Sequence, residues 1–196
     1  EVIQSWTVTR IPQSIVILPL GDHYPNQDVA LGGFASPGLR PPTYTSETPT
    51  VCRLMHAAQL RTERKGTCIF TAREPGDAAY EPAADVTRSF EVLAIPQTIL
   101  FTSPGPQVLG GGPVPLTIRT IVTGSEFHGL APTLTSMTPS VCTISGRNAM
   151  LLTVGTCTIV ARQPGNDQYD PAADVTQSFP VALGIPAAPI GVVAHV

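Results

Sequence analysis

The sequence has little charge, few aromatic side chains and no long apolar run. Charged residues make up 13% of the 196 residues and aromatic residues 6%, against roughly 25% charged residues in an average globular protein. The formal net charge is −3, with only 11 Lys and Arg residues. Nucleic-acid-binding domains usually carry a cluster of basic residues, which this composition does not favour. No apolar stretch approaches the ~18 residues of a membrane-spanning helix. We therefore expect no nucleic-acid partner and no membrane span.

Motifs that carry catalysis or bind metals are also missing. The chain has no C-x-x-C, no H-E-x-x-H and no G-x-S-x-G, which are the spacings of common metal, redox and hydrolase sites. Gly110–Gly112 lacks the lysine and the following helix of a phosphate loop, so it is interpreted as a turn. Four histidines stand at unrelated positions, His23, His56, His128 and His195. We expect no enzyme, no catalytic residue and no cofactor.

Proline and glycine are abundant, with 21 and 17 residues. Hydrophobic residues reach 42%, which is too high for a disordered chain of low net charge. This composition is typical of many short strands joined by tight turns.

A long internal repeat organises the chain. Leu39–Val92 and Gly129–Val181 share T-P-[ST]-V-C, then G-T-C, then A-R-x-P-G, then Y-x-P-A-A-D-V-T-x-S-F. Cys52 corresponds to Cys142 and Cys68 to Cys157, so the first copy has one extra residue between its cysteines. A period of this length indicates two copies of one domain, not a solenoid.

Each copy contains several short apolar or alternating runs and no helical periodicity. This pattern predicts an antiparallel β-sandwich for 9–93 and another for 94–183. The segments predicted as strands are Ile11–Pro19, Thr43–Ser46, Ile95–Ser103, Leu116–Val122, Thr133–Ser136, Val141–Ile144, Met150–Thr153, Thr156–Arg162 and Thr176–Val181. Pro104–Pro115 is expected to be a loop, and Ser145–Ala149 the turn of a hairpin.

The repeat pairs the four cysteines. We predict one structural disulfide in each domain, Cys52–Cys68 and Cys142–Cys157, with two buried free thiols per domain as the alternative. Closing a loop of about 16 residues stabilises a domain by on the order of 3 kcal/mol. Structural disulfides persist outside the cytosol, so we expect an extracellular or cell-surface protein.

Both ends of the chain repeat parts of the domain. Glu1–Val8 resembles the closing strands Asp85–Val92 and Asp174–Val181, with Trp6 in place of phenylalanine. The tail 184–196 resembles a first strand. Such strands pair with another partner unless they are covered. The residues predicted to form these assembly strands are Val2, Trp6, Val8, Ile190, Val192 and Val193. Either a longer array of domains or a filament assembled head to tail fits this pattern.

The repeated motifs resemble the bacterial immunoglobulin-like repeats of large secreted and surface proteins. The resemblance covers roughly Ile11–Val92 and Ile95–Val181 and is best in the second half of each copy. It implies an all-β fold of two tandem immunoglobulin-like antiparallel β-sandwiches. It also implies a stalk, spacer or adhesion role, and the family has no shared catalytic site. The first copy departs from the pattern at Arg53–Lys65, so the resemblance does not define its hairpin turn.

Two groups of side chains could bind a partner. Asp167, Asp170 and Asp174 carry hard oxygen ligands suited to calcium, although capping of the turn explains them as well. Arg53, Arg61, Arg64 and Lys65 are absent from the second copy and could contact an anionic partner. Protection of a strand edge is the other explanation of these charges.

The function predicted from the sequence is that of a non-enzymatic extracellular structural protein, a stalk or filament subunit. The alternative is an adhesion module that binds glycan or protein through its loops. Expected partners are other copies or neighbouring repeats, and a surface glycan or protein. The short link Leu93–Gln97 predicts a stiff, end-to-end joint between the domains.

Overall fold

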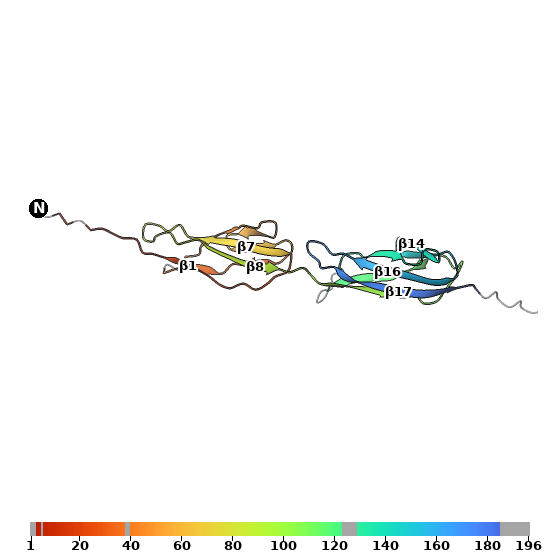
Figure 1. Ribbon diagram of the computed structural model, residues 1–196. Helices are drawn as coiled ribbons and strands as arrows, with labels where there is room; N and C mark the ends of the chain where they lie inside the picture. Colours follow the sequence, from red (N-terminus) through yellow and green to blue (C-terminus); the bar gives the residue numbers. More distant parts are fainter. Residues whose placement is uncertain (1–2, 5, 38–39, 123–128, 185–196) are drawn as a thin grey trace, which may run out of the picture. The chain divides into compact units, whose positions relative to one another are not determined.

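The computed structural model describes residues 3–4, 6–37, 40–122 and 129–184. The chain divides into two compact units, Glu1–Ile95 and Pro96–Val196. All regular elements of the described residues are β-strands, almost all paired antiparallel (Figure 1). The predicted all-β, antiparallel fold is therefore confirmed. None of the described residues forms a helix long and apolar enough to cross a membrane.

The described residues of the first unit form eight strands in three hydrogen-bonded sheets. The sheet orders are β1-β3, β2-β6-β5 and β4-β7-β8. The strands are β1 (Ser14–Ile17), β2 (Asp28–Ala30), β3 (Gly33–Ser36), β4 (Thr43–Ser46), β5 (Cys52–His56), β6 (Gln59–Thr62), β7 (Gly66–Arg73) and β8 (Val86–Val92).

In the second unit, the part of the chain that the structure describes forms nine strands, again in three sheets. The sheet orders are β12-β9, β11-β15-β14 and β10-β17-β16-β13. The strands are β9 (Gln97–Thr102), β10 (Gln107–Val108), β11 (Val114–Pro115), β12 (Thr117–Val122), β13 (Thr133–Ser136), β14 (Cys142–Ser145), β15 (Asn148–Leu151), β16 (Gly155–Gln163) and β17 (Ala172–Ala182).

The two units have the same topology, including the first halves where their sequences differ. Strands β1 and β3 pair as β9 and β12 do, and β2 pairs with β6 as β11 does with β15. The parallel pair β10–β17 corresponds to an isolated parallel bridge between His23 and Val92. The expectation of a plain loop over Pro104–Pro115 was wrong, because two short strands within it pair with β17 and β15.

The hairpins beside the cysteines explain the shift between the repeats. In the second unit Ser145 pairs with Asn148, so the turn is only Gly146–Arg147, shorter than predicted, with Gly146 at φ 60°. In the first unit the register of β5 and β6 shifts between Leu54 and His56. This bulge takes up the extra residue, so the hairpin of the first copy is kept.

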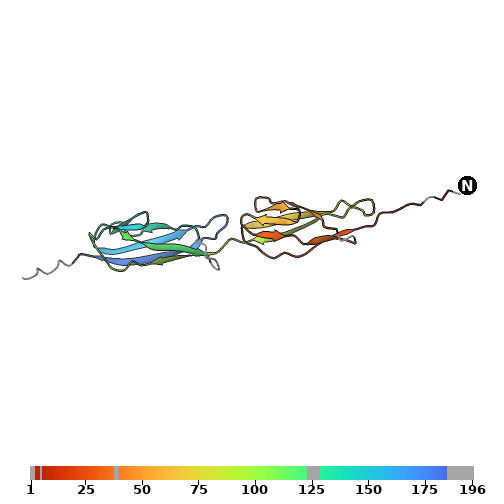
Figure 2. The same cartoon turned by 180° about the vertical axis from the view of Figure 1, so that it is seen from behind.

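The described residues form one cluster of buried apolar side chains in each unit. Figures 1 and 2 show the strands around these clusters from opposite sides. Phe70 is fully buried in the first core, with its ring centroid 6.4 Å from that of Phe90 and 6.2 Å from that of Tyr44. In the second core Phe179 is 1% exposed. The closing strands β8 and β17 place Phe90 and Phe179 directly opposite the second cysteine of their own repeat.

Candidate functional site

A disulfide joins two sheets in each unit. Cys52 on β5 is bonded to Cys68 on β7, and Cys142 on β14 to Cys157 on β16. All four cysteines are fully buried. Each bridge therefore fixes the spacing of two sheets that share no strand-to-strand hydrogen bonds.

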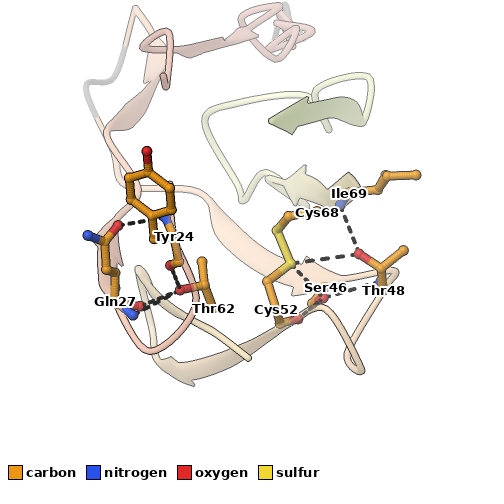
Figure 3. The surroundings of a disulfide bond; sticks show 8 residues. All are labelled: Tyr24, Gln27, Ser46, Thr48, Cys52, Thr62, Cys68 and Ile69. Atoms are coloured by element: carbon orange, nitrogen blue, oxygen red, sulfur yellow. Dashed lines mark hydrogen bonds between the residues drawn. A yellow bond between two sulfur atoms is a disulfide. The ribbon is translucent and has the colours of Figure 1, made fainter. Parts of the chain in front are cut away.

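Two hydroxyl groups surround the first disulfide (Figure 3). The Thr48 hydroxyl oxygen accepts the Ile69 N–H at 2.9 Å and lies 3.7 Å from Cys52 Sγ. The Ser46 hydroxyl donates to the Cys52 carbonyl at 2.5 Å and lies 3.6 Å from the same sulfur. The turn between β4 and β5 is thus tied to β7 beside the bridge.

The second disulfide has the same surroundings. Thr138 Oγ1 accepts the Thr158 N–H at 2.9 Å and lies 3.8 Å from Cys142 Sγ, and Ser136 Oγ lies 3.5 Å from that sulfur. The shared T-P-[ST]-V-C motif and the serine two residues before it therefore have a structural role: their hydroxyl groups lie beside the disulfide.

The loop before β2 is held by Thr62, a fully buried residue at the end of β6 (Figure 3). Its hydroxyl donates to the Tyr24 carbonyl at 2.7 Å and accepts the Gln27 N–H at 2.9 Å. Burying a hydroxyl without a hydrogen bond is unfavourable, so these two bonds stabilise the buried position of Thr62. The contact orders a loop whose sequence differs from its counterpart.

A glutamine at the start of each unit reaches the loop before the closing strand. Gln13 Nε2 donates to the Glu81 carbonyl, and Gln97 Nε2 to the Asp170 carbonyl, both at 2.8 Å. This contact explains why Ile-Pro is followed by Gln in both copies.

The same loop is closed by an Asx turn in each copy. Asp77 Oδ1 accepts the N–H groups of Ala79 and Tyr80 at 2.7 and 3.0 Å. Asn166 Oδ1 accepts those of Gln168 and Tyr169 at 2.8 and 3.0 Å. These bonds to the charged form lower the pKa of Asp77 below its ordinary value, helped by Arg40 at 2.5 Å.

One shallow cleft is present at the same place in each unit, each with a volume of about 300 Å³. The side chains correspond one to one. The first cleft is lined by Thr43, Arg73, Glu74, Pro75, Pro82, Ala83 and Asp85. The second cleft is lined by Thr133, Arg162, Gln163, Pro164, Pro171, Ala172 and Asp174.

An ion pair of identical geometry lines each cleft. Arg73 Nε lies 2.8 Å from Asp85 Oδ2, and Arg162 Nε lies 2.8 Å from Asp174 Oδ2. The side chains of both pairs are about half exposed, at 48% to 54%. Exposed pairs of this kind contribute about 0–1 kcal/mol to stability. Their main effect is therefore to fix the positions of the two side chains beside each cleft.

The predicted calcium ligands are not brought together as a metal site. Asp174 is held by Arg162, and the turn is capped by Asn166 instead of the aspartates. No group of three or more His, Cys, Asp or Glu side chains that could hold a metal occurs in the described parts of the chain. Asp167, Asp170 and Asp174 are therefore interpreted as turn and ion-pair residues.

The basic cluster of the first copy is partly neutralised within its own unit. Arg53 Nε lies 2.5 Å from Glu63 Oε1, and Arg61 Nη1 lies 2.9 Å from Asp28 Oδ1. Binding of an anionic partner by Arg53, Arg61, Arg64 and Lys65 stays a prediction. Any such partner would compete with these internal acids.

The turns at one end of the two sandwiches differ in polarity. Met137, Leu152 and Val154 lie in the turns before β14 and β16 and are 57%, 51% and 48% exposed. The first unit has charged residues at the same positions, Glu47, Glu63 and Lys65. The second unit therefore presents apolar surface where the first presents charge.

The copy of the closing strand at 1–8 is not in a strand at its described positions. Ile3, Trp6 and Val8 are 88%, 85% and 89% exposed. The other predicted assembly residues, Val2, Ile190, Val192 and Val193, lie outside the described residues.

Comparison with known proteins gives only distant likenesses. No family model matches the chain, and no curated protein matches it. Surface layer protein SbsC, domains 1–6, is 17% identical over 90% of this chain and 28% of that chain, with a TM-score of 0.44. SbsC domains 4 and 5 are 16% identical over 86% and 96%, with a TM-score of 0.39. Drosophila N-cadherin EC1–4 is 10% identical over 87% and 51%, with a TM-score of 0.30.

The chain spans under a third of the length of the first of these structures. At these identities and TM-scores the likeness carries no inference about function.

Sequence reasoning missed the two clefts. Their prolines, arginine and aspartate all lie within the repeated A-R-x-P-G and P-A-A-D motifs. The variable position of the first motif, Glu74 in one copy and Gln163 in the other, was the signal that could have identified the difference between them.

Proposed function

We propose that the chain is a non-enzymatic structural segment of an extracellular or cell-surface protein, built from immunoglobulin-like sandwiches. It would serve as a stalk or as a filament subunit. The disulfides of both sandwiches support an oxidising location. The repetition of whole structural devices, from the hydroxyls beside each bridge to the clefts, supports a role based on stacked copies of one module.

The observation that carries assembly through terminal strands is the position of Trp6. Its counterparts Phe90 and Phe179 are 5% and 1% exposed, whereas Trp6 is 85% exposed. Burial of a large aromatic side chain stabilises by roughly 1.5–3 kcal/mol. Segment 1–8 therefore has the residues of a closing strand, and pairing it with a terminal strand of another copy would bury them.

Trp6 is the only tryptophan of the chain, so its fluorescence reports directly on this proposal. If Trp6 is buried where segment 1–8 pairs with a terminal strand of another copy, the emission maximum should shift to shorter wavelength as protein concentration rises. Sedimentation velocity should show larger species over the same concentration range. An unshifted emission maximum with a monomeric chain at high concentration would contradict self-assembly through this segment.

Deletion of 1–8 gives the matching control. The two sandwiches should remain folded, because the strands that complete them are β8 and β17. Assembly should be lost if segment 1–8 is the connector. A truncated chain that still forms the same large species would exclude this segment.

The apolar turns of the second unit offer a second contribution to self-association. The first unit supplies the control, because it carries charge at the same positions. Replacing Leu152 with Glu and Val154 with Lys copies its turn, and this change should weaken association without unfolding the sandwich. The reverse change, Glu63→Leu with Lys65→Val, should promote association.

A further inference from the structure

The first cleft contains a largely buried glutamate whose carboxylate opens to the cleft and has no partner among the described residues. Glu74 is 6% exposed and lines the cleft. Within the described residues its carboxylate has no hydrogen bond and no ion pair, and only its backbone carbonyl is used, by the Ala83 N–H at 3.0 Å. Removing an ionised carboxylate from most of its water without giving it a partner is unfavourable.

The second cleft shows how this position is satisfied when it is neutral. Gln163 Nε2 donates to the Ala131 carbonyl at 2.8 Å, and Gln163 Oε1 accepts the Gly165 N–H at 2.7 Å. A carboxylate cannot donate as Nε2 does. Glu74 therefore cannot reproduce the contacts of Gln163 while it is charged.

The neighbouring cation, Arg73, forms no ion pair with Glu74 in the described part of the chain, because its side chain is directed to other groups. Arg73 donates from Nε to Asp85 at 2.8 Å and from Nη1 to Thr45 at 3.1 Å. The first cleft therefore has one negative charge in excess, whereas the ion pair of the second cleft is balanced. An incoming cation fits the first cleft and not the second.

We propose that the first cleft binds the ammonium group of a lysine side chain presented by a partner protein. The ammonium would pair with Glu74, and the aliphatic stem would lie on Pro75, Pro82 and Ala83, which line the same cleft. Lysine combines an apolar stem with a charged tip in this way. A divalent metal would need more oxygen ligands than this cleft offers, since the described residues hold no group of three suitable side chains.

The test uses N-acetyl-lysine-N-methylamide, titrated into the isotope-labelled full chain and followed by NMR. Resonances of Ala83 and Asp85 should shift, whereas those of Ala172 and Asp174 in the second cleft should not. N-acetyl-norleucine-N-methylamide has a similar stem without the ammonium and should give no selective shift. Equal shifts in both clefts, or none in the first, would overturn the proposal.

Two substitutions exchange the side chains that differ between the clefts. Glu74→Gln creates the side chain that the second cleft already carries, so it should fold and should weaken the affinity for the lysine probe by tenfold or more, as expected for a lost charge-assisted hydrogen bond of roughly 1.5–3 kcal/mol. Gln163→Glu should make the second cleft respond to the probe. Unchanged affinity in the Glu74→Gln variant would overturn the assignment of Glu74, whatever the behaviour of the second variant.

Discussion

The Tyr44 hydroxyl lies 2.6 Å from the position that a β-carbon on Gly33 would occupy. Gly33 on β3 therefore makes room for the phenol ring, which is 4% exposed and packs on Phe70. The second unit has the pair Ile118 and Leu134 at these positions. Both line a pocket of about 350 Å³, so this place in the two units carries different pairs of side chains.

We expect Tyr44→Phe to leave the first unit equally stable or to stabilise it by up to about 1 kcal/mol. The Tyr44 hydroxyl is buried and has no hydrogen-bond partner among the described residues, and its burial raises the pKa of the phenol. Urea unfolding of the two proteins measures the difference. A loss of more than ~1 kcal/mol would show that the hydroxyl is paired in solution.

Gly33→Ala should destabilise the first unit by about 1–3 kcal/mol, the usual cost of overpacking. The added carbon would also lie 2.9 Å from the Val16 carbonyl, which is backbone and cannot move aside easily. The cost should be smaller in the Tyr44→Phe background, because the closest atom is then gone. A double-mutant cycle of unfolding free energies gives this coupling, and a coupling of zero would contradict the contact.

Thr48→Ala should destabilise the first unit by about 1–2 kcal/mol, because the Ile69 N–H loses its acceptor. Thr48→Ser keeps the hydroxyl and is the control. Thr138→Ala should have the same effect on the second unit alone, since Thr138 accepts the Thr158 N–H. Hydrogen exchange of the Ile69 and Thr158 amides would show whether each change acts only on its own sandwich.

Reduction of the disulfides should destabilise each unit by on the order of 3 kcal/mol, as expected for closed loops of about 16 residues. Intact mass before and after reduction with thiol capping counts the bridges. The unreduced, denatured protein should have no thiol that can be capped. Four capped thiols in that sample would contradict both bridges and the extracellular location proposed from them.

Acid should weaken the first unit in part through Asp77. Its pKa in the folded state is lowered by the N–H groups of Ala79 and Tyr80 and by Arg40, relative to the ordinary value of 3.8. A lowered folded-state pKa means that the stabilisation is complete above the unfolded-state pKa and is lost as pH falls through the folded-state pKa. We therefore expect Asp77 to stabilise the first unit at neutral pH and to stop doing so in strong acid.

Asp77→Asn is the matched variant, because asparagine already caps this turn in the second unit as Asn166. The difference in unfolding free energy between the two proteins should be largest above about pH 4 and should shrink in more acidic solution. Urea unfolding of the first unit across this range, followed by its NMR signals, checks the prediction. A difference that does not change with pH would contradict it.

The repeat made much of the fold predictable. Thr43–Ser46 and Thr133–Ser136 are strands with the predicted bounds, because alternating residues followed by a Thr-Pro turn leave few alternatives. The pairing of the first half of each unit was not predictable. His23 and Val108 pair with closing strands far along the chain, and local sequence carries no signal of such long-range contacts.

The candidate sites were also predictable only in part. Motif position identified the cysteines, but it could not show that Asp28 and Glu63 would pair with Arg61 and Arg53. Those acids come from other strands and turns, and only the fold brings them beside the arginines. The buried position of Glu74 also depends on packing between the start of one strand and a loop, which the local sequence does not show.

The two disulfides also limit how far each sandwich can lengthen when it is pulled from its ends. Tension that opens the first unit passes directly from Cys52 to Cys68 through the sulfur atoms, and the chain between them, with a sequence separation of 16, stays slack. At about 3.5 Å per extended residue, the bridge withholds roughly 50 Å of chain from each opened sandwich. In a series of such sandwiches, each unfolding event would therefore lengthen the oxidised chain less than the reduced chain. Single-molecule extension would distinguish the two redox states by this gain in length.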